Sequence, residues 1–396
     1  MAINKTDKVL NVPTLRFPGF TDKWEKKRVG DIAKLSKGAG ISKDDRSISG
    51  VPCILYGELY TTYNSEIINK VVSKTELPLD NLVQSEGNDV IIPSSGESAI
   101  DISTARCITT SGILLGGDLN IIRLKNDDGR FLSYQLNGVR KLDIAKVAQG
   151  VSVVHLYGDA LKSISVSLPH IDEQKKIADF LSLLDERIAL QSKLIEDLKK
   201  LKSAIVESLY GLLATKVRLG TIIKQVSIRN RNGSEREIMS VSNKYGFIAQ
   251  SEQFEERIVA SEDTSNYKVI APEIFAYNPA RINVGSIAQY KGDRPCIVSP
   301  MYICFECGKQ VVGGYLEHFF STKYFHKEME KRLEGSVRLC LSFEALCNIS
   351  ISLPPIEQQL KYAQVVGRIS DQISIESDIL QVYQKQKSYL LSAMFI

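Results

Sequence analysis

Arginine, lysine and asparagine side chains gather in a few loop-like stretches of the sequence, between short apolar runs. Residues 227–236, SIRNRNGSER, hold three arginines and two asparagines. Arginine and lysine neutralise DNA phosphates, and arginine and asparagine form paired hydrogen bonds with guanine and adenine edges. An ordinary solvated loop would also favour these residues, so that alternative stays open. On composition and position we predict DNA contacts in the first half of the chain from Lys37, Lys43 and Arg46, and less strongly from Ser94, Ser95 and Glu97, and in the second half from Arg229, Asn230, Arg231, Asn232, Arg281, Asn283 and Arg294.

Motifs for catalysis or cofactor binding are absent from the sequence. It contains neither G-x-x-x-x-G-K-[ST] nor a strand followed by G-x-G-x-x-G, the phosphate-binding loops of nucleotide enzymes. Cys304 and Cys307 form a lone CxxC, whereas a structural zinc site needs four ligands. Cys340 and Cys347 could complete such a site in space, but the alternation in MYICFEC favours a strand. We therefore expect no catalytic residue, no metal and no cofactor in this chain.

The composition is that of a cytoplasmic globular protein with more than one domain. The chain has 396 residues, a formal charge of +4 and seven scattered cysteines. The odd cysteine count indicates reduced thiols, and no apolar run reaches the ~18 residues that a membrane span requires. A charge of +4 spread over this length permits a nucleic-acid partner without requiring one.

A long internal repeat organises the sequence. ISVSLPHIDEQ, from Ile164, returns as ISISLPPIEQQ, from Ile349, at a constant offset of 185. Gly150 then matches Gly335, and Tyr210 matches Phe395. Near the start of each half, RVGDI at Arg28 is similar to RLGTI at residue 218. A period this long exceeds the ~20–50 residues of solenoid repeats, so the sequence indicates a duplicated domain.

Each repeat of the LP motif leads into a stretch with the 3.5-residue apolar period of a coiled coil. The apolar positions are Ile177, Leu181, Leu184, Ile188, Ile195, Leu198, Ile205, Leu209 and Leu212 in the first stretch, and Tyr362, Val366, Ile369, Ile373, Leu380, Tyr383, Leu390 and Met394 in the second. Polar residues interrupt both series at equivalent places, Gln191 and Lys202 against Glu376 and Lys387. Such residues fix register, and in an antiparallel pair we expect Lys202 near Glu376 and Gln191 near Lys387.

With the repeated SLP-x-I-[DE]-x-Q motif and the leader PTLRFPGFTDKWE at Pro13, the chain resembles the DNA-specificity subunit of type I restriction–modification systems. GGDLN at Gly116 and NPARINVGSI at Asn278 are similar to the target-recognition domains of that family. The resemblance implies an α+β fold with two similar target-recognition domains, joined by two long helices that form an antiparallel coiled coil with a pseudo-twofold internal repeat. It also implies that each domain reads one half of a bipartite, asymmetric DNA site.

The same resemblance implies the partners and their cofactors. Two methyltransferase subunits would dock on the coiled coil and bind S-adenosylmethionine, and separate restriction subunits would use ATP and Mg²⁺. The domain boundaries we expect are a leader at 1–27, a first target-recognition domain at 28–169, a first spacer helix at 170–215, a second target-recognition domain at 216–354 and a second spacer helix at 355–396.

Two other functions remain possible on the sequence. The first is a coiled-coil scaffold or regulator that binds DNA without sequence preference, which the contrast between variable blocks and matching helices disfavours. The second is a metal-dependent nuclease built on Asp44, Asp45 and Asp128. Cleavage of DNA by the purified chain alone would support that second function.

Overall fold

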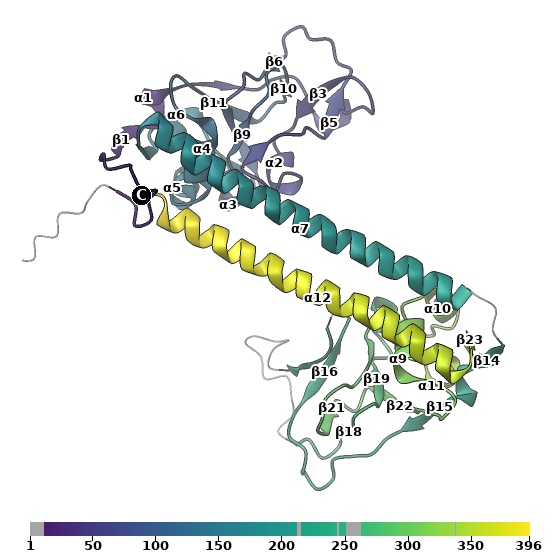
Figure 1. Ribbon diagram of the computed structural model, residues 1–396. Coiled ribbons are helices and arrows are strands. Elements are labelled where there is room, and N and C mark those ends of the chain that lie inside the picture. The colour runs from purple at the N-terminus through teal and green to yellow at the C-terminus, as the bar shows by residue number, and fades with distance from the viewer. Residues whose placement is uncertain (1–11, 212–214, 244, 251–262, 337) are drawn as a thin grey trace, which may run out of the picture. The chain divides into compact units, whose positions relative to one another are not determined.

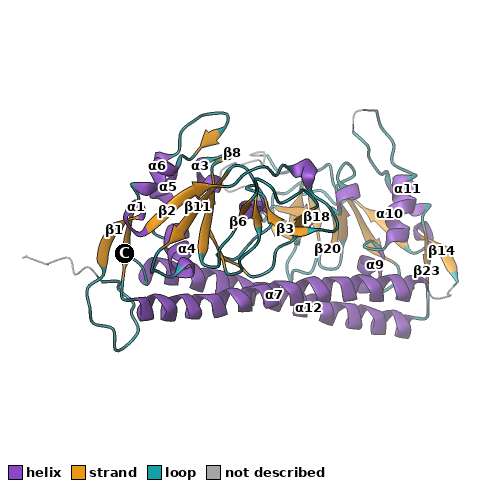
Figure 2. Cartoon of the chain, turned by 90° about the horizontal axis from the view of Figure 1, so that it is seen from above, coloured by secondary structure: helices purple, strands orange, loops and turns teal. Residues whose placement is uncertain are grey.

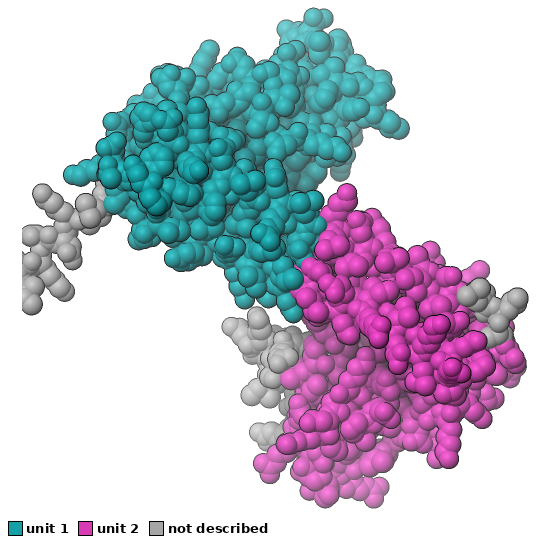
Figure 3. All heavy atoms as spheres, in the orientation of Figure 1, with its two compact units in different colours: residues 1–192, 378–396 teal, residues 193–377 magenta. Residues whose placement is uncertain are grey.

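The computed structural model describes residues 12–211, 215–243, 245–250, 263–336 and 338–396 (Figure 1). The chain divides into two compact units, residues 1–192 with 378–396 (unit 1) and residues 193–377 (unit 2; Figure 3). The divisions fall inside two long helices, α7 (Ile171–Gly211) and α12 (Ile356–Ala393), so each unit contains a segment of both. Leu212, which we placed in the predicted helix seam, lies outside the described residues.

Unit 1 is built on a five-stranded sheet with the order β2-β11-β7-β9-β4. Its strands are β2 (Ala33–Lys37), β11 (Leu119–Leu124), β7 (Asp89–Pro93), β9 (Arg106–Ile108) and β4 (Ile67–Ile68). A four-stranded sheet contains β5 (Ser73–Thr75), β3 (Val51–Ile54), β10 (Leu114–Leu115) and β6 (Val83–Gln84). Two-stranded pairs join β1 (Glu25–Arg28) to β13 (Ser165–Leu168), and β8 (Ser95–Gly96) to β12 (Val154–His155). The short helices are α1 (Val29–Ile32), η1 (Lys43–Asp45), α2 (Glu58–Thr61), α3 (Ala99–Ile102), α4 (Gly129–Asn137), α5 (Lys141–Val147) and α6 (Gly158–Lys162).

Unit 2 has a four-stranded sheet with the order β15-β22-β19-β20. Its strands are β15 (Ile223–Val226), β22 (Ile303–Cys307), β19 (Phe275–Tyr277) and β20 (Ile287–Gln289). Three strand pairs surround it: β16 (Met239–Ser242) with β17 (Gly246–Ala249), β18 (Lys268–Ile270) with β21 (Cys296–Val298), and β14 (Lys216–Arg218) with β23 (Ser350–Ser352). The helices are η2 (Leu219–Thr221), η3 (Ile282–Val284), α9 (Gly313–Phe319), α10 (Lys323–Glu330) and α11 (Phe343–Cys347).

The internal repeat seen in the sequence is a structural repeat. In unit 1 the strand that leads into α7 pairs antiparallel with β1, and in unit 2 the strand that leads into α12 pairs antiparallel with β14. The cores repeat as well. Phe131 and Phe395 lie 5.1 Å apart in unit 1, and their equivalents Tyr315 and Tyr210 lie 4.6 Å apart in unit 2, measured between ring centroids.

The repeated glutamine of the LP motif has the same structural role in both units. The Gln174 side chain donates to the carbonyl of Pro169, and its oxygen accepts the N–H of Asp128, the residue before α4. Gln359 donates to the carbonyl of Pro354 and accepts the N–H of Val312, the residue before α9. A buried amide with both ends bonded satisfies backbone groups that a helix start leaves unpaired. Because both units use these hydrogen bonds, the glutamine of the motif is present in both repeats.

Segments of α7 and α12 pack together in each unit, as the apolar pattern predicted, and in unit 1 they run antiparallel, as the resemblance implied. In unit 1, Asp185 contacts Lys387 and the Arg187 guanidinium lies over the Tyr383 ring. Residue numbers rise along α7 where they fall along α12, so the two helices run in opposite directions. In unit 2, Tyr210 and Tyr362 both pack against Tyr315. The predicted seam residues that the structure describes are buried or half-buried.

Candidate nucleic-acid interface

One edge of the unit 1 sheet brings together loops that the sequence marked separately. β2 and β7 are both antiparallel to β11, so they run parallel to each other and their carboxyl ends lie at the same edge. Lys37 ends β2 opposite Asn120, and Pro93 ends β7 opposite Leu119. The loops at 38–50 and 94–98 therefore both leave from this edge, which we call the loop edge of unit 1. In Figure 2, β8 of this edge lies on the side of the unit away from α7 and α12.

Unit 2 has an equivalent loop edge. β15 and β19 are both antiparallel to β22, where Val226 pairs with Cys304 and Tyr277 with Ile303. Their carboxyl ends lead into the loops at 227–237 and 278–285. The structure thus places the arginine- and asparagine-rich stretch next to the NPARINVGSI stretch, although about fifty residues separate them in sequence.

Most of the predicted DNA-contacting side chains at the two loop edges are exposed. Those in unit 1 are Lys37, Lys43, Arg46 and Glu97, and those in unit 2 are Arg229, Arg231, Asn232, Arg281 and Asn283. Arg46 donates from Nε to the carbonyl of Lys43, and Arg229 donates to the side-chain oxygen of Asn266 at 2.6 Å. These contacts leave further guanidinium N–H groups for a ligand. That they bind DNA stays a prediction.

Three predicted contacts are contradicted by burial. Ser94 and Ser95 are 5% and 8% exposed, and the main chain of Ser94 bonds to Asp118 and Leu156. Asn230 is fully buried, and its side-chain amide bonds to both backbone groups of Glu235. These side chains shape the loops from inside, so the prediction that they contact DNA directly was wrong.

Arg294 is exposed but lies away from the loop edge of unit 2. It belongs to the connection between β20 and β21, at the other end of β20 from Asn283. Its carbonyl accepts a hydrogen bond from the Tyr290 hydroxyl. The structure therefore does not group Arg294 with Arg281.

The polar seam residues do not pair as expected. The Lys387 ammonium lies 2.5 Å from Asp185 Oδ1 and 2.5 Å from Glu66 Oε2. Asp185 precedes Gln191 by six residues, about 9 Å along a helix, so the expected pairing of Lys387 with Gln191 was wrong. Burial raises the pKa of Glu66 although Lys387 opposes that shift. The ion pairs tie a loop of unit 1 to both long helices.

Lys202, the equivalent of Lys387, has different surroundings in unit 2. Burial lowers its pKa, and the carboxylate whose field acts on it most is Glu317 rather than Glu376. Glu317 itself forms an ion pair with Lys291 at 2.7 Å. The side chain of Glu376 accepts a hydrogen bond from Gln372 on the same helix.

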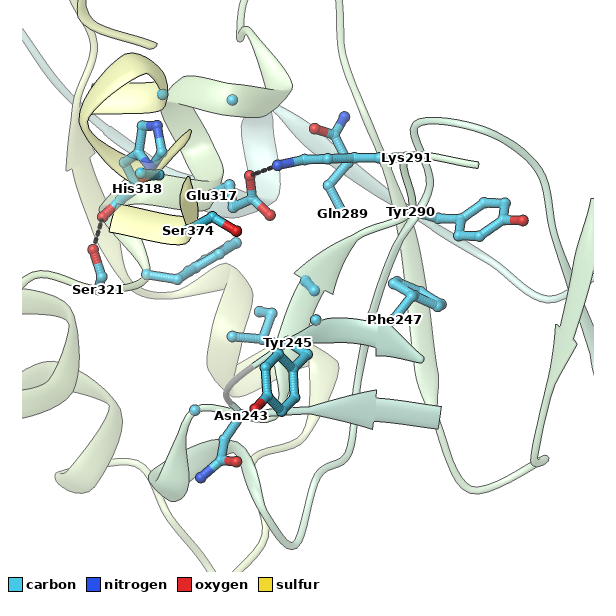
Figure 4. A pocket seen from close by; sticks show the side chains of 18 of the residues that line it. Asn243, Tyr245, Phe247, Gln289, Tyr290, Lys291, Glu317, His318, Ser321 and Ser374 are labelled. Atoms are coloured by element: carbon cyan, nitrogen blue, oxygen red, sulfur yellow. Dashed lines mark hydrogen bonds and ion pairs between the residues drawn. The ribbon is translucent and has the colours of Figure 1, made fainter. Parts of the chain in front are cut away.

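Unit 2 also contains a cavity of about 1190 Å³ between α12, α9 and the β16–β17 pair (Figure 4). Lys202 and Asn283 line it, and Figure 4 shows the Lys291–Glu317 ion pair across from Asn243 and Tyr245. Burial lowers the pKa of His318 to about 4, so this imidazole is neutral at pH 7. Four carboxylates against two lysines make the lining a poor phosphate site, which favours the loop edges as the nucleic-acid interface.

The cysteines and acidic residues form no metal site in the part of the chain that the structure describes. Cys304 and Cys307 lie in β22, as the strand prediction required, and alternation places them on opposite faces of that strand. Asp128 caps α4 and Asp45 closes η1, so these carboxylates have local structural partners. None of the described helices is long and apolar enough to cross a membrane.

Two exposed loops that composition and motifs did not single out complete the loop edges. Residues 149–155 precede α6, and the Leu156 N–H donates to the Ser94 carbonyl. Residues 334–336 and 338–340 precede α11, and the Leu341 N–H donates to the Pro279 carbonyl. The match of Gly150 with Gly335 was the signal for these loops, although a single repeated glycine did not reveal what they expose.

Comparison with known proteins finds relatives of this chain. Residues 21–200 match the family model described as the type I restriction modification DNA specificity domain. Over the whole chain, 24% of residues are identical to the type I restriction enzyme MjaVIII specificity subunit of Methanocaldococcus jannaschii, 96% of which is covered. A putative MjaX specificity subunit of that organism is 22% identical over 70% of each chain.

Solved structures share the fold. The crystal structure of the type I restriction–modification system S subunit from M. genitalium has a TM-score of 0.64, with 17% identity over 97% of this chain and 99% of that one. A chain from a study of assembly and conformational transition in the type I R-M system has a TM-score of 0.52 and 15% identity, covering 95% of this chain and 98% of that one. Residues 21–200 therefore match the type I restriction modification DNA specificity domain, and the whole chain shares the fold of these S-subunit structures.

Proposed function

We propose that this chain is a specificity subunit of a type I restriction–modification system, and that each of its units reads one half of a bipartite, asymmetric DNA site through its loop edge. The proposal rests on a contrast between the two repeats: their buried residues make the same contacts, whereas their exposed loop residues differ. The buried parts, such as Gln174 and Gln359, make the same bonds in both units. The exposed side chains of the loops at the two edges differ, apart from the glycine that Gly150 and Gly335 share. Two similar scaffolds with unlike exposed loops fit two half-sites of different sequence.

The chemistry of the loop edges supports DNA rather than a protein as the ligand. The unit 2 edge exposes Arg229, Arg231 and Arg281. Guanidinium groups fit both phosphates and guanine edges, and exposed asparagines such as Asn283 fit adenine. The unit 1 edge exposes Lys37 and Lys43, which suit phosphate contacts.

The long helices carry the second part of the proposal, the docking of two methyltransferase subunits. Both helices expose large apolar side chains outside their mutual seam, which is unusual for a surface without a partner. In unit 1 these are Phe180, Leu183, Leu190, Val382 and Tyr389, and in unit 2 they are Leu194, Leu201, Leu360, Val365 and Ile375. A partner that contributes its own apolar helices would cover them. Because both units present such faces, two copies of the same partner fit.

Catalysis would then belong to the partners and not to this chain. S-adenosylmethionine would bind to the methyltransferase subunits, which would transfer its methyl group to adenine N6. Restriction subunits would use ATP and Mg²⁺. This chain would select the site and hold the two readers at a distance set by its helices.

The test is to co-express the chain with the methyltransferase encoded beside it and to map N6-methyladenine by sequencing the host DNA. We expect one motif with two different half-sites separated by a fixed number of unread base pairs. A continuous motif, or methylation without sequence preference, would refute the proposal. Cells with the methyltransferase alone are the control.

A further inference from the structure

The two loops that complete the loop edges have the same backbone geometry. In unit 1 the N–H and C=O groups of Gln149 and His155 bond to each other reciprocally, at 2.9 and 2.7 Å. In unit 2 Glu334 and Cys340 do the same, at 3.0 and 2.8 Å. We call the residues 149–155 arm 1, and the described residues 334–336 and 338–340 arm 2. Both arms are narrow loops closed at their base by one antiparallel bridge.

A glycine is required at the same place in each arm. Gly150 has φ +121° and Gly335 has φ +129°, which are values that side chains rarely allow. A Cβ on Gly150 would lie 2.1 Å from the Val153 carbonyl oxygen, and one on Gly335 would lie 2.2 Å from the Arg338 carbonyl oxygen. The backbone bridge and the glycine of each arm therefore determine its conformation.

The side chains that the arms present differ in chemistry. Arm 1 exposes Val151, which is 96% exposed, and Val153, which is 53% exposed. Arm 2 exposes Arg338 at the position equivalent to Val153. Two arms with the same backbone conformation therefore present an apolar side chain in unit 1 and a cation in unit 2, at equivalent positions of the two loop edges.

We propose that both arms contact DNA, and that Val153 and Arg338 give the two half-sites different contacts at equivalent positions. This inference rests on the proposed function. A methyltransferase subunit that docks twice would meet the same chemistry in both units, whereas two unlike half-sites require different side chains in the same pose. Arg338 adds a cation to an edge that already exposes Arg281 and Arg229. Val153 suits the methyl group of thymine.

A guanidinium can bind a phosphate or a guanine edge, and the two contacts have different signatures. Loss of one phosphate contact makes the slope of log K against log[salt] less negative by about 0.9. Between 50 and 200 mM salt, the affinity of such a variant would therefore fall about 3.5-fold less than that of the wild type. Loss of a base contact relaxes one position of one half-site. Either result supports a DNA contact by arm 2.

The experiment uses the full chain in complex with its co-expressed methyltransferase subunit, bound to a duplex that carries the mapped site. Arg338→Val is expected to flatten the salt slope or to relax one position in one half-site. The reciprocal Val153→Arg should steepen the slope by about 0.9 or change the preferred base at one position of the other half-site. Lys309→Val is the charge-matched control, since Lys309 is exposed and follows the carboxyl end of β22 at the opposite edge of the sheet, and it should change neither quantity.

Both exchanged side chains are exposed, so the variants should fold, and unchanged thermal melts will establish this. An Arg338→Val complex with the wild-type salt slope and site would overturn the inference for arm 2. An unchanged slope together with an unchanged half-site for Val153→Arg would overturn it for arm 1. A wild-type complex that methylates no defined site would instead overturn the proposed function, so the two failures are distinguishable.

Discussion

Replacing Lys387 by methionine tests whether its buried ion pairs stabilise the packing of unit 1 against its segments of α7 and α12. The ammonium is 15% exposed and lies 2.5 Å from carboxylates that are 8% and 6% exposed. The Asp185 carboxylate also accepts a hydrogen bond from the Tyr134 hydroxyl at 2.7 Å. Lys387→Met would leave two carboxylates buried without their cation. Removing one partner of a buried ion pair costs about 3–5 kcal/mol, so we expect a loss of this size in the free energy of unfolding.

Lys202→Met is the matched control because Lys202 occupies the equivalent position of the repeat. Burial lowers the pKa of Lys202, so its charged form is disfavoured in the folded state, and methionine should be neutral or stabilising there. Differential scanning calorimetry of the full chain measures both variants. At 2–4 °C per kcal/mol for a domain of this size, Lys387→Met should lower the Tm of unit 1 by about 6–20 °C.

The pH dependence gives an independent check of this reasoning. Burial raises the pKa of Glu66, so its ionised form costs folding free energy as pH rises through that pKa. Losing the ammonium removes a charge that opposes this rise in pKa, so the deficit of the variant relative to the wild type should shrink as pH falls and Glu66 becomes protonated. Adding Glu66→Gln and Asp185→Asn should restore much of the stability. Equal Tm values for Lys387→Met and Lys202→Met would refute the role we assign to the ion pairs.

Three other predictions concern the helices and unit 2. Inserting seven residues after both Gln191 and Glu376 lengthens each helix by about 10 Å, so the unread gap between half-sites should grow by about 3 base pairs with both half-sites intact; an unchanged gap in the methylation map would contradict the spacer role. Leu190→Glu, at a side chain that is 68% exposed, should abolish co-purification with the methyltransferase subunit without lowering the Tm, and retained co-purification would exclude this face from docking. Because burial lowers the pKa of His318 to about 4, the unfolded state takes up the proton first as pH falls, so unit 2 should lose about 2 kcal/mol between pH 7 and pH 5, measured by hydrogen exchange in α9. His318→Gln should abolish that loss, and an identical loss in this variant would assign it to another group.

Features that depend on local sequence or on the repeat could be predicted from the chain alone. The heptad pattern gave the seam of α7 and α12, because burial on one helix face repeats every 3.5 residues. The repeated LP motif located the starts of both helices, and structure shows why its glutamine recurs, since Gln174 and Gln359 bond the starts of α4 and α9. Arg229 and Arg231 of the arginine-rich stretch are exposed, as both a DNA-binding loop and an ordinary solvated loop would require.

Features that depend on distant contacts could not be predicted in this way. Nothing near Glu66 in the sequence marks it as a partner of Lys387, which is 321 residues away. Composition also did not distinguish Asn230, which turns inward to bond Glu235, from the exposed Asn232 two residues later. Arm 1 was overlooked because its exposed residues include valine, which a search for charged and amide side chains passes over, and arm 2 because Arg338 does not stand in a cluster of such side chains.

The central claim is that each unit reads its own half-site, and changing one unit alone tests it most directly. Arg229, Arg231 and Arg281 can be replaced by alanine together in the loop edge of unit 2, and the variant's methylation map compared with that of the wild type. We expect one half of the motif to become relaxed or altered, while the other half and the gap between them stay as they were. Changes in both halves, or an intact motif, would contradict it.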